Sequence, residues 1–392
     1  MRGSSAPGRG DAPAPTSPRP LTVVFAGGGT GGHTAAGLAL ATALRARLGD
    51  GLRLAWIGSE TGIEATWVPA AGMPYHPIPT GKLRRQLAWR NVTDLTLRVP
   101  AGLGRAVALL GRLRPDVVVA TGGFVAVPTA VAAAVRRLPL LVHEQVVVPG
   151  LANRFIGRLA DRVAVTFAAS AGAFPPGKVV VTGNPIRPAL RAGRRERGFA
   201  RFALDPAVPL TYVTGGALGA HRVNRVVGAA LAPLLSVTQL VHQCGDNAQG
   251  DLAWLRGEGE RLPPALRARY RVQALVGEEL GDLYAAASLV VGRAGAGTVT
   301  ELAALGLPAI LVPLPGARGD EQTANARVLA DAGAAVLLPE RELTPERLVG
   351  EVRALLAEPA RLRTMAERAR SLATPDAAEQ LVDLVLAVAR RA

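Results

Sequence analysis

The chain has 392 residues and a formal net charge of +15, and 49% of its residues are hydrophobic while only 4% are aromatic. This length exceeds what one hydrophobic core usually organises, so two domains are expected. The positive charge favours an anionic partner, such as a phosphorylated substrate or an acidic membrane surface. Nucleic acid would also suit the charge, but so few aromatic residues leave no stacking platform, and we expect no nucleic-acid partner.

Cysteine content and apolar runs limit the cellular setting. Cys244 is the only cysteine, which excludes an intrachain disulfide. The longest apolar run, residues 126–135, is too short to span a bilayer. Residues 1–20 are rich in Pro, Gly, Ala, Ser and Arg and lack the apolar stretch of a signal peptide, so they predict a disordered extension. We expect a cytosolic protein with, at most, a peripheral membrane attachment.

The first part of the chain alternates short apolar runs with longer helical patterns. The runs predict buried strands at residues 21–26, 52–57, 116–120, 138–142 and 162–166. Helix-length segments such as 33–48 and 105–113 lie between them. Apolar strands separated by helices indicate a parallel sheet that is covered on both faces.

A Gly-Asn-Pro-Ile-Arg-Pro turn at residues 183–188 interrupts the alternation of strands and helices, which then resumes. The second series predicts strands at residues 210–214, 239–242, 271–274, 289–292, 309–312 and 335–338. We therefore expect an α/β protein with two doubly wound, Rossmann-like domains, residues 21–187 and 188–373, that face a cleft. Residues 374–392 predict an amphipathic helix, capped by Thr374, that packs back on the N-terminal domain.

A glycine-rich loop, residues 27–33, follows the first strand and opens a helix. Its glycines permit close backbone approach, and the helix N-terminus presents unpaired N–H groups to an anion. The loop satisfies the dinucleotide-binding spacing, although Glu60 and Glu64 suit the required acidic position poorly. His33 is a candidate general base, because a helix N-terminus disfavours its protonated form. A histidine that only braces the loop is the alternative.

The second domain carries two similar loops, residues 214–220 and 292–298, and either could hold a diphosphate on its N–H groups. Glu301 follows the second of these loops. It could accept hydrogen bonds from two ribose hydroxyls, or it could form a capping box with Thr298. Polar residues 320–326 open a further helix and suit hydrogen bonds to a sugar, unless Asp320 merely caps that helix.

Together these segments resemble the MurG transferases, which belong to the GT-B class of glycosyltransferases. The resemblance spans about residues 21–390, and its motifs occur in the family's order: residues 28–33, 143–145, 183–187, 293–301 and 320–326. It implies inverting transfer of N-acetylglucosamine from UDP-N-acetylglucosamine to the C4 hydroxyl of undecaprenyl-diphospho-N-acetylmuramoyl pentapeptide. That reaction converts lipid I to lipid II in peptidoglycan synthesis. No Asp-x-Asp motif occurs, so we expect neither a metal nor another cofactor.

The resemblance also implies roles for individual residues. The donor would be held by Gly215, Gly216, Ala217, Val276, Gly295, Ala296, Thr298, Glu301, Gln322 and Asn325. The acceptor would be held by Thr30, Gly31, Gly32, His33, Gln145, Asn153 and Arg187. His33 is the candidate base, and Glu144 is the second candidate.

The chain departs from the family pattern at several positions. Val146 replaces the usual Asn, Ala217-Leu218 replaces Ser-Gln, and Ala36 replaces Pro. These departures leave open a paralogue with another acceptor or donor and a binding protein without activity. Two further alternatives rest on other features: a UDP-sugar epimerase would share the two-domain architecture, and a nicotinamide-dependent dehydrogenase could use the first glycine loop but would leave the second-domain loops unexplained.

Residues 81–114 combine Lys82 and seven arginines with one acid, Asp94, and interleave them with apolar side chains. Such a surface would adhere to anionic lipid, unless the segment is a solvated helix face over core leucines. The predicted membrane contacts are Leu83, Arg84, Arg85, Leu87, Trp89 and Arg90. The expected location is the cytoplasmic face of the cell membrane, where other cell-wall synthesis proteins are further candidate partners.

Overall fold

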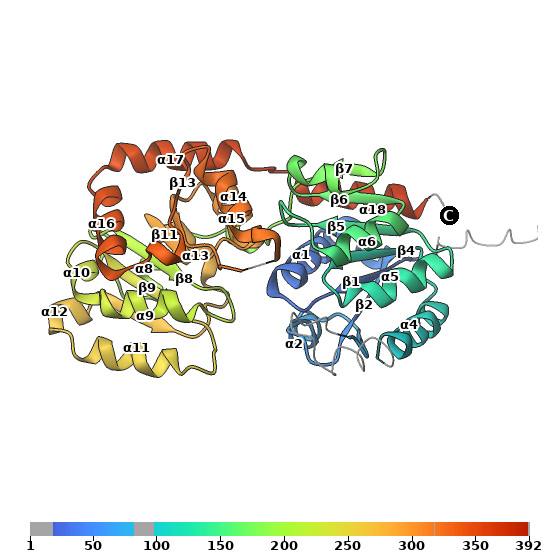
Figure 1. Cartoon of the computed structure of the whole chain (residues 1–392), viewed down its shortest axis with the longest axis horizontal. Helices are drawn as coiled ribbons and strands as arrows, with labels where there is room; N and C mark the ends of the chain where they lie inside the picture. Colours follow the sequence, from blue (N-terminus) through green and yellow to red (C-terminus); the bar gives the residue numbers. More distant parts are fainter. Residues whose placement is uncertain (1–18, 82–97, 317, 391–392) are drawn as a thin grey trace, which may run out of the picture.

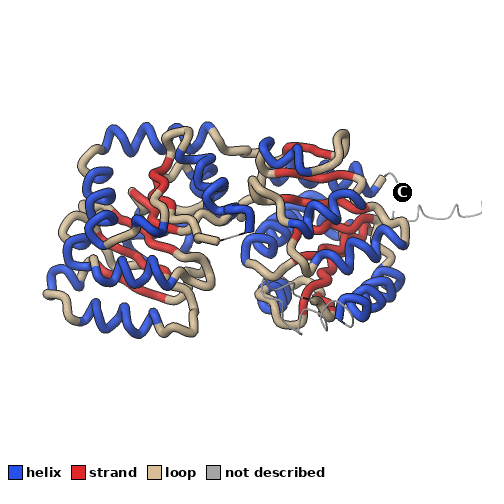
Figure 2. Tube along the Cα trace, in the orientation of Figure 1, coloured by secondary structure: helices blue, strands red, loops and turns tan. Residues whose placement is uncertain are grey.

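The computed structural model describes residues 19–81, 98–316 and 318–390. It has two lobes, each built around one parallel β-sheet with helices on both faces (Figures 1 and 2). Among the described residues, none of the helices is long and apolar enough to span a membrane. The predicted membrane contacts between Leu83 and Arg90 lie outside the described residues.

The N-terminal domain contains a seven-stranded sheet with the strand order β3-β2-β1-β4-β5-β6-β7. Its strands are β1 (Leu21–Gly27), β2 (Leu52–Ser59), β3 (Tyr75–Ile78), β4 (Val117–Gly122), β5 (Leu140–Glu144), β6 (Arg162–Val165) and β7 (Val179–Val181). Its helices are α1 (Gly31–Leu48), α2 (Glu64–Ala70), α4 (Val99–Leu113), α5 (Ala126–Val135) and α6 (Leu151–Leu159). The central strands are buried on both faces, which explains why their sequences are continuously apolar.

The C-terminal domain contains a six-stranded sheet with the order β10-β9-β8-β11-β12-β13. Its strands are β8 (Leu210–Thr214), β9 (Gln239–Gln243), β10 (Tyr270–Gln273), β11 (Leu289–Gly292), β12 (Ala309–Leu311) and β13 (Ala335–Leu337). Its helices are α7 (Pro188–Arg191), α8 (Arg195–Arg201), α9 (His221–Ala229), α10 (Leu231–Leu235), α11 (Asp251–Glu260), α12 (Pro264–Arg267), α13 (Leu280–Ala286), α14 (Ala296–Leu305), α15 (Glu321–Ala330), α16 (Pro345–Leu356) and α17 (Pro359–Ser371).

The chain crosses between the domains twice. The first crossing runs from β7 to α7, and the second runs from α17 to α18 (Ala377–Ala389). Helix α18 lies against α1 in the N-terminal domain, where its Leu381 and Val385 join the core that contains Phe25 and Leu44. Its apolar stripe therefore fastens the end of the chain to the first domain.

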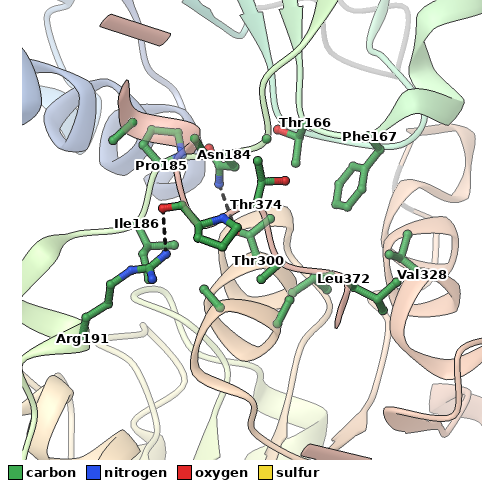
Figure 3. A pocket seen from close by; sticks show the side chains of 18 of the residues that line it. Thr166, Phe167, Asn184, Pro185, Ile186, Arg191, Thr300, Val328, Leu372 and Thr374 are labelled. Atoms are coloured by element: carbon green, nitrogen blue, oxygen red, sulfur yellow. Dashed lines mark hydrogen bonds between the residues drawn. The ribbon is translucent and has the colours of Figure 1, made fainter. Parts of the chain in front are cut away.

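The two crossings lie beside each other and border a cavity of about 250 Å³ (Figure 3). The Asn184 side-chain amide donates to the Thr300 hydroxyl over 3.0 Å, which ties the first crossing to α14. Gly183 has a φ of +76°, and a Cβ at this position would lie 2.6 Å from the Cβ of Thr374 on the second crossing. Only glycine fits there without strain.

The predicted fold class, two Rossmann-like α/β domains, is confirmed. Every strand predicted from the sequence is present, with ends that shift by at most two residues, but β3 and β7 were missed. The prediction that Thr374 caps the last helix is wrong. Helix α18 begins at Ala377 after Asp376, without a side-chain cap, and Thr374 packs against Gly183 instead.

Candidate functional site

The glycine-rich loops of both domains lie at the point where the strand order of each parallel sheet reverses. In the first sheet, β1 and β4 are neighbours, so the loop after β1 meets the loop after β4. In the second sheet, β8 and β11 are neighbours, so the loops that begin at Gly215 and Arg293 meet in the same way. Such switch points at the carboxyl ends of parallel strands are the usual ligand sites of open α/β sheets.

Glu64 braces the first glycine loop, a role that the sequence did not reveal. One carboxylate oxygen accepts the Gly29 N–H over 3.0 Å, and the other accepts the Ser59 hydroxyl over 2.5 Å. A Cβ on Gly28 would lie 2.1 Å from this carboxylate, so the loop and Glu64 fit together only because Gly28 lacks a side chain. In a dinucleotide site the acid near the second strand would bind a ribose, but here it is committed to the loop.

His33 lies in the first turn of α1, whose N-cap position is Thr30. It is partly buried, and its Nδ1 lies 2.6 Å from Gln145 Oε1. Burial lowers the pKa of His33 below its usual value, while the Gln145 contact and the Glu321 carboxylate act in the opposite direction. The imidazole is therefore neutral near pH 7 and able to accept a proton. Thr30, Gly31 and Gly32 are partly or fully exposed beside it.

Three other predicted residues, Glu144, Gln145 and Asn153, are at most 3% exposed. The Glu144 carboxylate accepts the Val146 N–H and the Asn153 side-chain amide, each over 2.9 Å. Burial raises the pKa of Glu144. With both oxygens engaged and no exposed surface, Glu144 holds the loop after β5 in this conformation rather than facing an acceptor. The geometry thus favours His33 over Glu144 as the base.

The loop after β5 also contacts the C-terminal domain. The Val147 N–H donates to Asn325 Oδ1 over 3.0 Å, and Asn325 Nδ2 donates to the Ala294 carbonyl over 3.2 Å. Asn325 is fully buried, so in this conformation it joins the two domains. Gln322 is partly exposed and accepts the Leu314 N–H over 3.0 Å, which leaves its amide nitrogen for other partners.

Gln243 links the two parts of the second domain that are predicted to hold the donor. Its amide nitrogen donates to the Gly216 carbonyl over 3.1 Å, and its oxygen accepts the Val276 N–H over 2.9 Å. The sequence did not identify Gln243, because nothing in a buried strand end distinguishes this contact from core packing. Ala217 is partly exposed on the same loop, and Leu218 is 72% exposed.

Glu301 does not form the alternative capping box. Helix α14 has Gly295 at its N-cap position and no side-chain cap, so Thr298 is the third residue of the helix rather than its cap. The Glu301 carboxylate instead accepts the Tyr284 hydroxyl over 3.0 Å. Burial raises the pKa of Glu301, and the charge of Arg187 opposes this shift. Arg187, predicted to bind the acceptor, is therefore placed near the predicted ribose-binding carboxylate.

Comparison with known proteins identifies the family. The glycosyltransferase family 28 N-terminal domain matches residues 23–165, and its C-terminal domain matches residues 210–381. The chain belongs to glycosyltransferase family 28. It is 43% identical over 375 residues to a UDP-N-acetylglucosamine–N-acetylmuramyl-(pentapeptide) pyrophosphoryl-undecaprenol N-acetylglucosamine transferase from a Nocardioides species, covering 93% of this chain and 98% of the relative.

Solved structures agree with this assignment. The crystal structure of Acinetobacter baumannii MurG is similar with a TM-score of 0.70 and 31% identity, covering 94% of this chain and all of that one. The resemblance to MurG transferases is thus confirmed. A UDP-GlcNAc 2-epimerase from Neisseria meningitidis is also similar, with a TM-score of 0.64 over 94% of this chain and all of that one. At 13% identity, however, it shares only the fold of this family 28 chain.

Proposed function

We propose that this chain transfers N-acetylglucosamine from UDP-N-acetylglucosamine to the C4 hydroxyl of lipid I, which yields lipid II. Two observations support this proposal: both family 28 domains match the chain, and a relative named for this transfer aligns with 93% of it. The geometry is compatible with it, because two glycine-loop switch points offer separate sites for two phosphorylated substrates.

The donor is assigned to the C-terminal domain. The N-terminus of α14 and the loop after β8 hold its diphosphate on main-chain N–H groups, while Glu301 accepts hydrogen bonds from the ribose hydroxyls. Gln322 and Asn325 are assigned to the sugar, and the backbone of Val276 to the uracil. Asn325 is fully buried, so its contact with the sugar requires its hydrogen bond with Val147 to open. Because Gln243 already binds the Val276 N–H, uracil either exchanges with Gln243 or uses the Val276 carbonyl.

The reaction is one inverting displacement. The acceptor oxygen forms a bond to the anomeric carbon as the bond to the UDP oxygen breaks, and the hydroxyl proton passes to His33. Negative charge develops on the departing diphosphate, where the helix α14 dipole and loop N–H groups stabilise it. Neutral His33 suits a base, because burial lowers its pKa.

The acceptor is assigned to the N-terminal domain. Thr30, Gly31 and Gly32 at the start of α1 present N–H groups to its diphosphate beside His33. The buried Glu144, Gln145 and Asn153 hold the wall of this site, and contact with the acceptor through them requires a rearrangement. No metal or other cofactor enters this scheme.

A peripheral position on the cytoplasmic membrane face is part of the proposal, because the acceptor is lipid-linked and residues 81–114 are basic. Other cell-wall synthesis proteins are proposed as partners there. Co-sedimentation with anionic liposomes tests the contact. Binding should fall when Arg84, Arg85 and Arg90 are replaced together by Gln, and unchanged binding would refute the membrane role of this segment.

The test of the function is transfer of radiolabelled N-acetylglucosamine to lipid I and, in parallel, to a polyprenyl-diphosphate sugar without the muramoyl peptide. Label on lipid I alone supports the proposal. Label on the second acceptor alone supports the paralogue alternative, for which Ala217, Leu218 and Val146 are the motivating departures. Conversion of the donor to UDP and free sugar without any acceptor supports an epimerase.

A further inference from the structure

A chain of hydrogen bonds runs from the candidate base into the first domain crossing. It links His33 to Gln145, Gln145 to His143, and His143 to the Gly183 carbonyl, over 2.6, 3.1 and 3.3 Å. We propose that Gln145 is a positioning residue that fixes the tautomer of His33, so that Nδ1 carries the proton and Nε2 is left to receive one. This inference deepens the proposed function and rests on it for the role of His33 in transfer.

The orientation of the Gln145 amide follows from its neighbours. Its nitrogen lies 2.9 Å from the Thr121 carbonyl and 2.9 Å from the His143 carbonyl, and both of these groups can only accept hydrogen bonds. The opposite orientation would place the amide oxygen against two carbonyl oxygens in a buried site. Gln145 Oε1 must therefore face His33.

The His33 tautomer then has one solution. Gln145 Oε1 accepts only, so the His33 nitrogen 2.6 Å away must be Nδ1–H. In the other tautomer two lone pairs would face each other at that distance, and a buried acceptor would lose its partner. In a neutral imidazole with Nδ1 protonated, Nε2 holds the lone pair that a general base needs.

His143 lies between Gln145 and the first domain crossing, and its tautomer follows in the same way. Its Nε2 faces the Gly183 carbonyl, which only accepts, so the proton is on Nε2 and the unprotonated Nδ1 faces Gln145 Nε2. The two N–H groups of the Gln145 amide are shared among this nitrogen and the Thr121 and His143 carbonyls. His143 is fully buried, and burial lowers its pKa to about 4, which keeps it neutral. Backbone carbonyls thus orient Gln145 and His143, Gln145 in turn orients His33, and none of the three needs a charge.

Other groups face His33 and act on its charge rather than on its tautomer. Glu321 approaches from α15 across the cleft, Glu64 belongs to α2, and His143 lies behind Gln145 on β5. The two carboxylates favour the protonated imidazole, and burial opposes it. The Thr121 carbonyl also faces the imidazole and favours its protonated form, while the Gln145 side chain makes the 2.6 Å contact with Nδ1.

The first experiment reads the tautomer directly, without substrate. The chain has five histidines, so ¹⁵N-labelled histidine gives a small set of ring signals that single substitutions can assign. At pH 8 we expect Nδ1–H and an unprotonated Nε2 for His33. In Gln145→Met we expect the two tautomers to mix. Gln145→Glu, with one oxygen protonated against the Thr121 and His143 carbonyls, keeps its other oxygen as an acceptor and preserves Nδ1–H. An Nε2–H signal for His33 in the unmodified chain would overturn the inference.

The second experiment reads kinetics. Gln145→Met should lower kcat about tenfold or more, with KM for the lipid-linked acceptor changed less than about twofold. Gln145→Glu should retain more activity than Gln145→Met, because an acceptor still faces His33 Nδ1. Gln380→Met is the matched control, since the Gln380 side chain donates to Asp376 at the start of α18 rather than to a residue of the candidate site.

The outcomes separate the two claims. A raised acceptor KM with kcat unchanged in Gln145→Met would make Gln145 an acceptor-binding residue and refute its positioning role. The expected tautomer together with no transfer to any acceptor would refute the proposed function and leave the assignment of Gln145 intact. If neither variant folds, the ring spectrum of the unmodified chain still decides the tautomer.

Discussion

Replacement of Glu301 by Gln should weaken uridine nucleotide binding without unfolding the domain. In the proposed complex its carboxylate accepts hydrogen bonds from two ribose hydroxyls, and bonds to a charged group contribute about 1.5–3 kcal/mol each. Gln keeps one neutral acceptor and turns the other oxygen into a donor. The expected loss is about 2 kcal/mol or more, which corresponds to about a 30-fold rise in Kd.

Calorimetry with UDP and 2′-deoxy-UDP isolates this contact in a thermodynamic cycle. The unmodified chain should bind 2′-deoxy-UDP about tenfold or more weakly than UDP, because one hydrogen bond to Glu301 is lost. Glu301→Gln should discriminate between the two ligands by less than about threefold, since the charge is gone in both complexes. Glu346→Gln, on the exposed face of α16, is the matched control. Equal discrimination by Glu301→Gln and the unmodified chain would refute the ribose contact.

Three further predictions concern stability and cofactor need. Gly183→Ala should lower the free energy of unfolding by about 2 kcal/mol or more, because φ is +76° and the new Cβ would clash with Thr374. Gly177, with φ of +79°, faces open space, so Gly177→Ala should lose only about 1 kcal/mol from backbone strain. Equal losses in denaturant titrations would contradict this. Burial lowers the pKa of His242 to about 3, so below pH 6.5 the unfolded chain binds a proton at this residue that the folded chain does not. Between pH 7 and 4.5 the free energy of unfolding should therefore fall by about 2.5 kcal/mol more than in His242→Gln, and parallel pH curves would contradict this. Transfer should persist in excess EDTA, and a loss that Mg²⁺ restores would show that a metal is required.

The sequence predicted the central strands because they are buried on both faces and therefore continuously apolar. The two missed strands, Tyr75–Ile78 and Val179–Val181, are the edge strands of the first sheet. The first contains Pro77 and the second has only three residues that are partly or fully exposed. Edge strands need less apolar surface and tolerate proline, so their local pattern is weak.

The site was predictable where a loop follows a strand and opens a helix, because that geometry depends on local sequence. It was less predictable where a side chain meets a distant segment. Neither Glu64 under the first glycine loop nor Gln243 between Gly216 and Val276 carries a local signal. The motif that contains Gln145 drew attention to a buried residue whose contacts only the folded chain reveals.

The most direct test of the account measures UDP release and lipid-linked label in the same reaction with UDP-N-acetylglucosamine and lipid I, followed by determination of the new linkage. One UDP should appear for each N-acetylglucosamine transferred, and the linkage should be β, as a single displacement requires. UDP release without label on the lipid, or a product of α configuration, would contradict the proposed reaction.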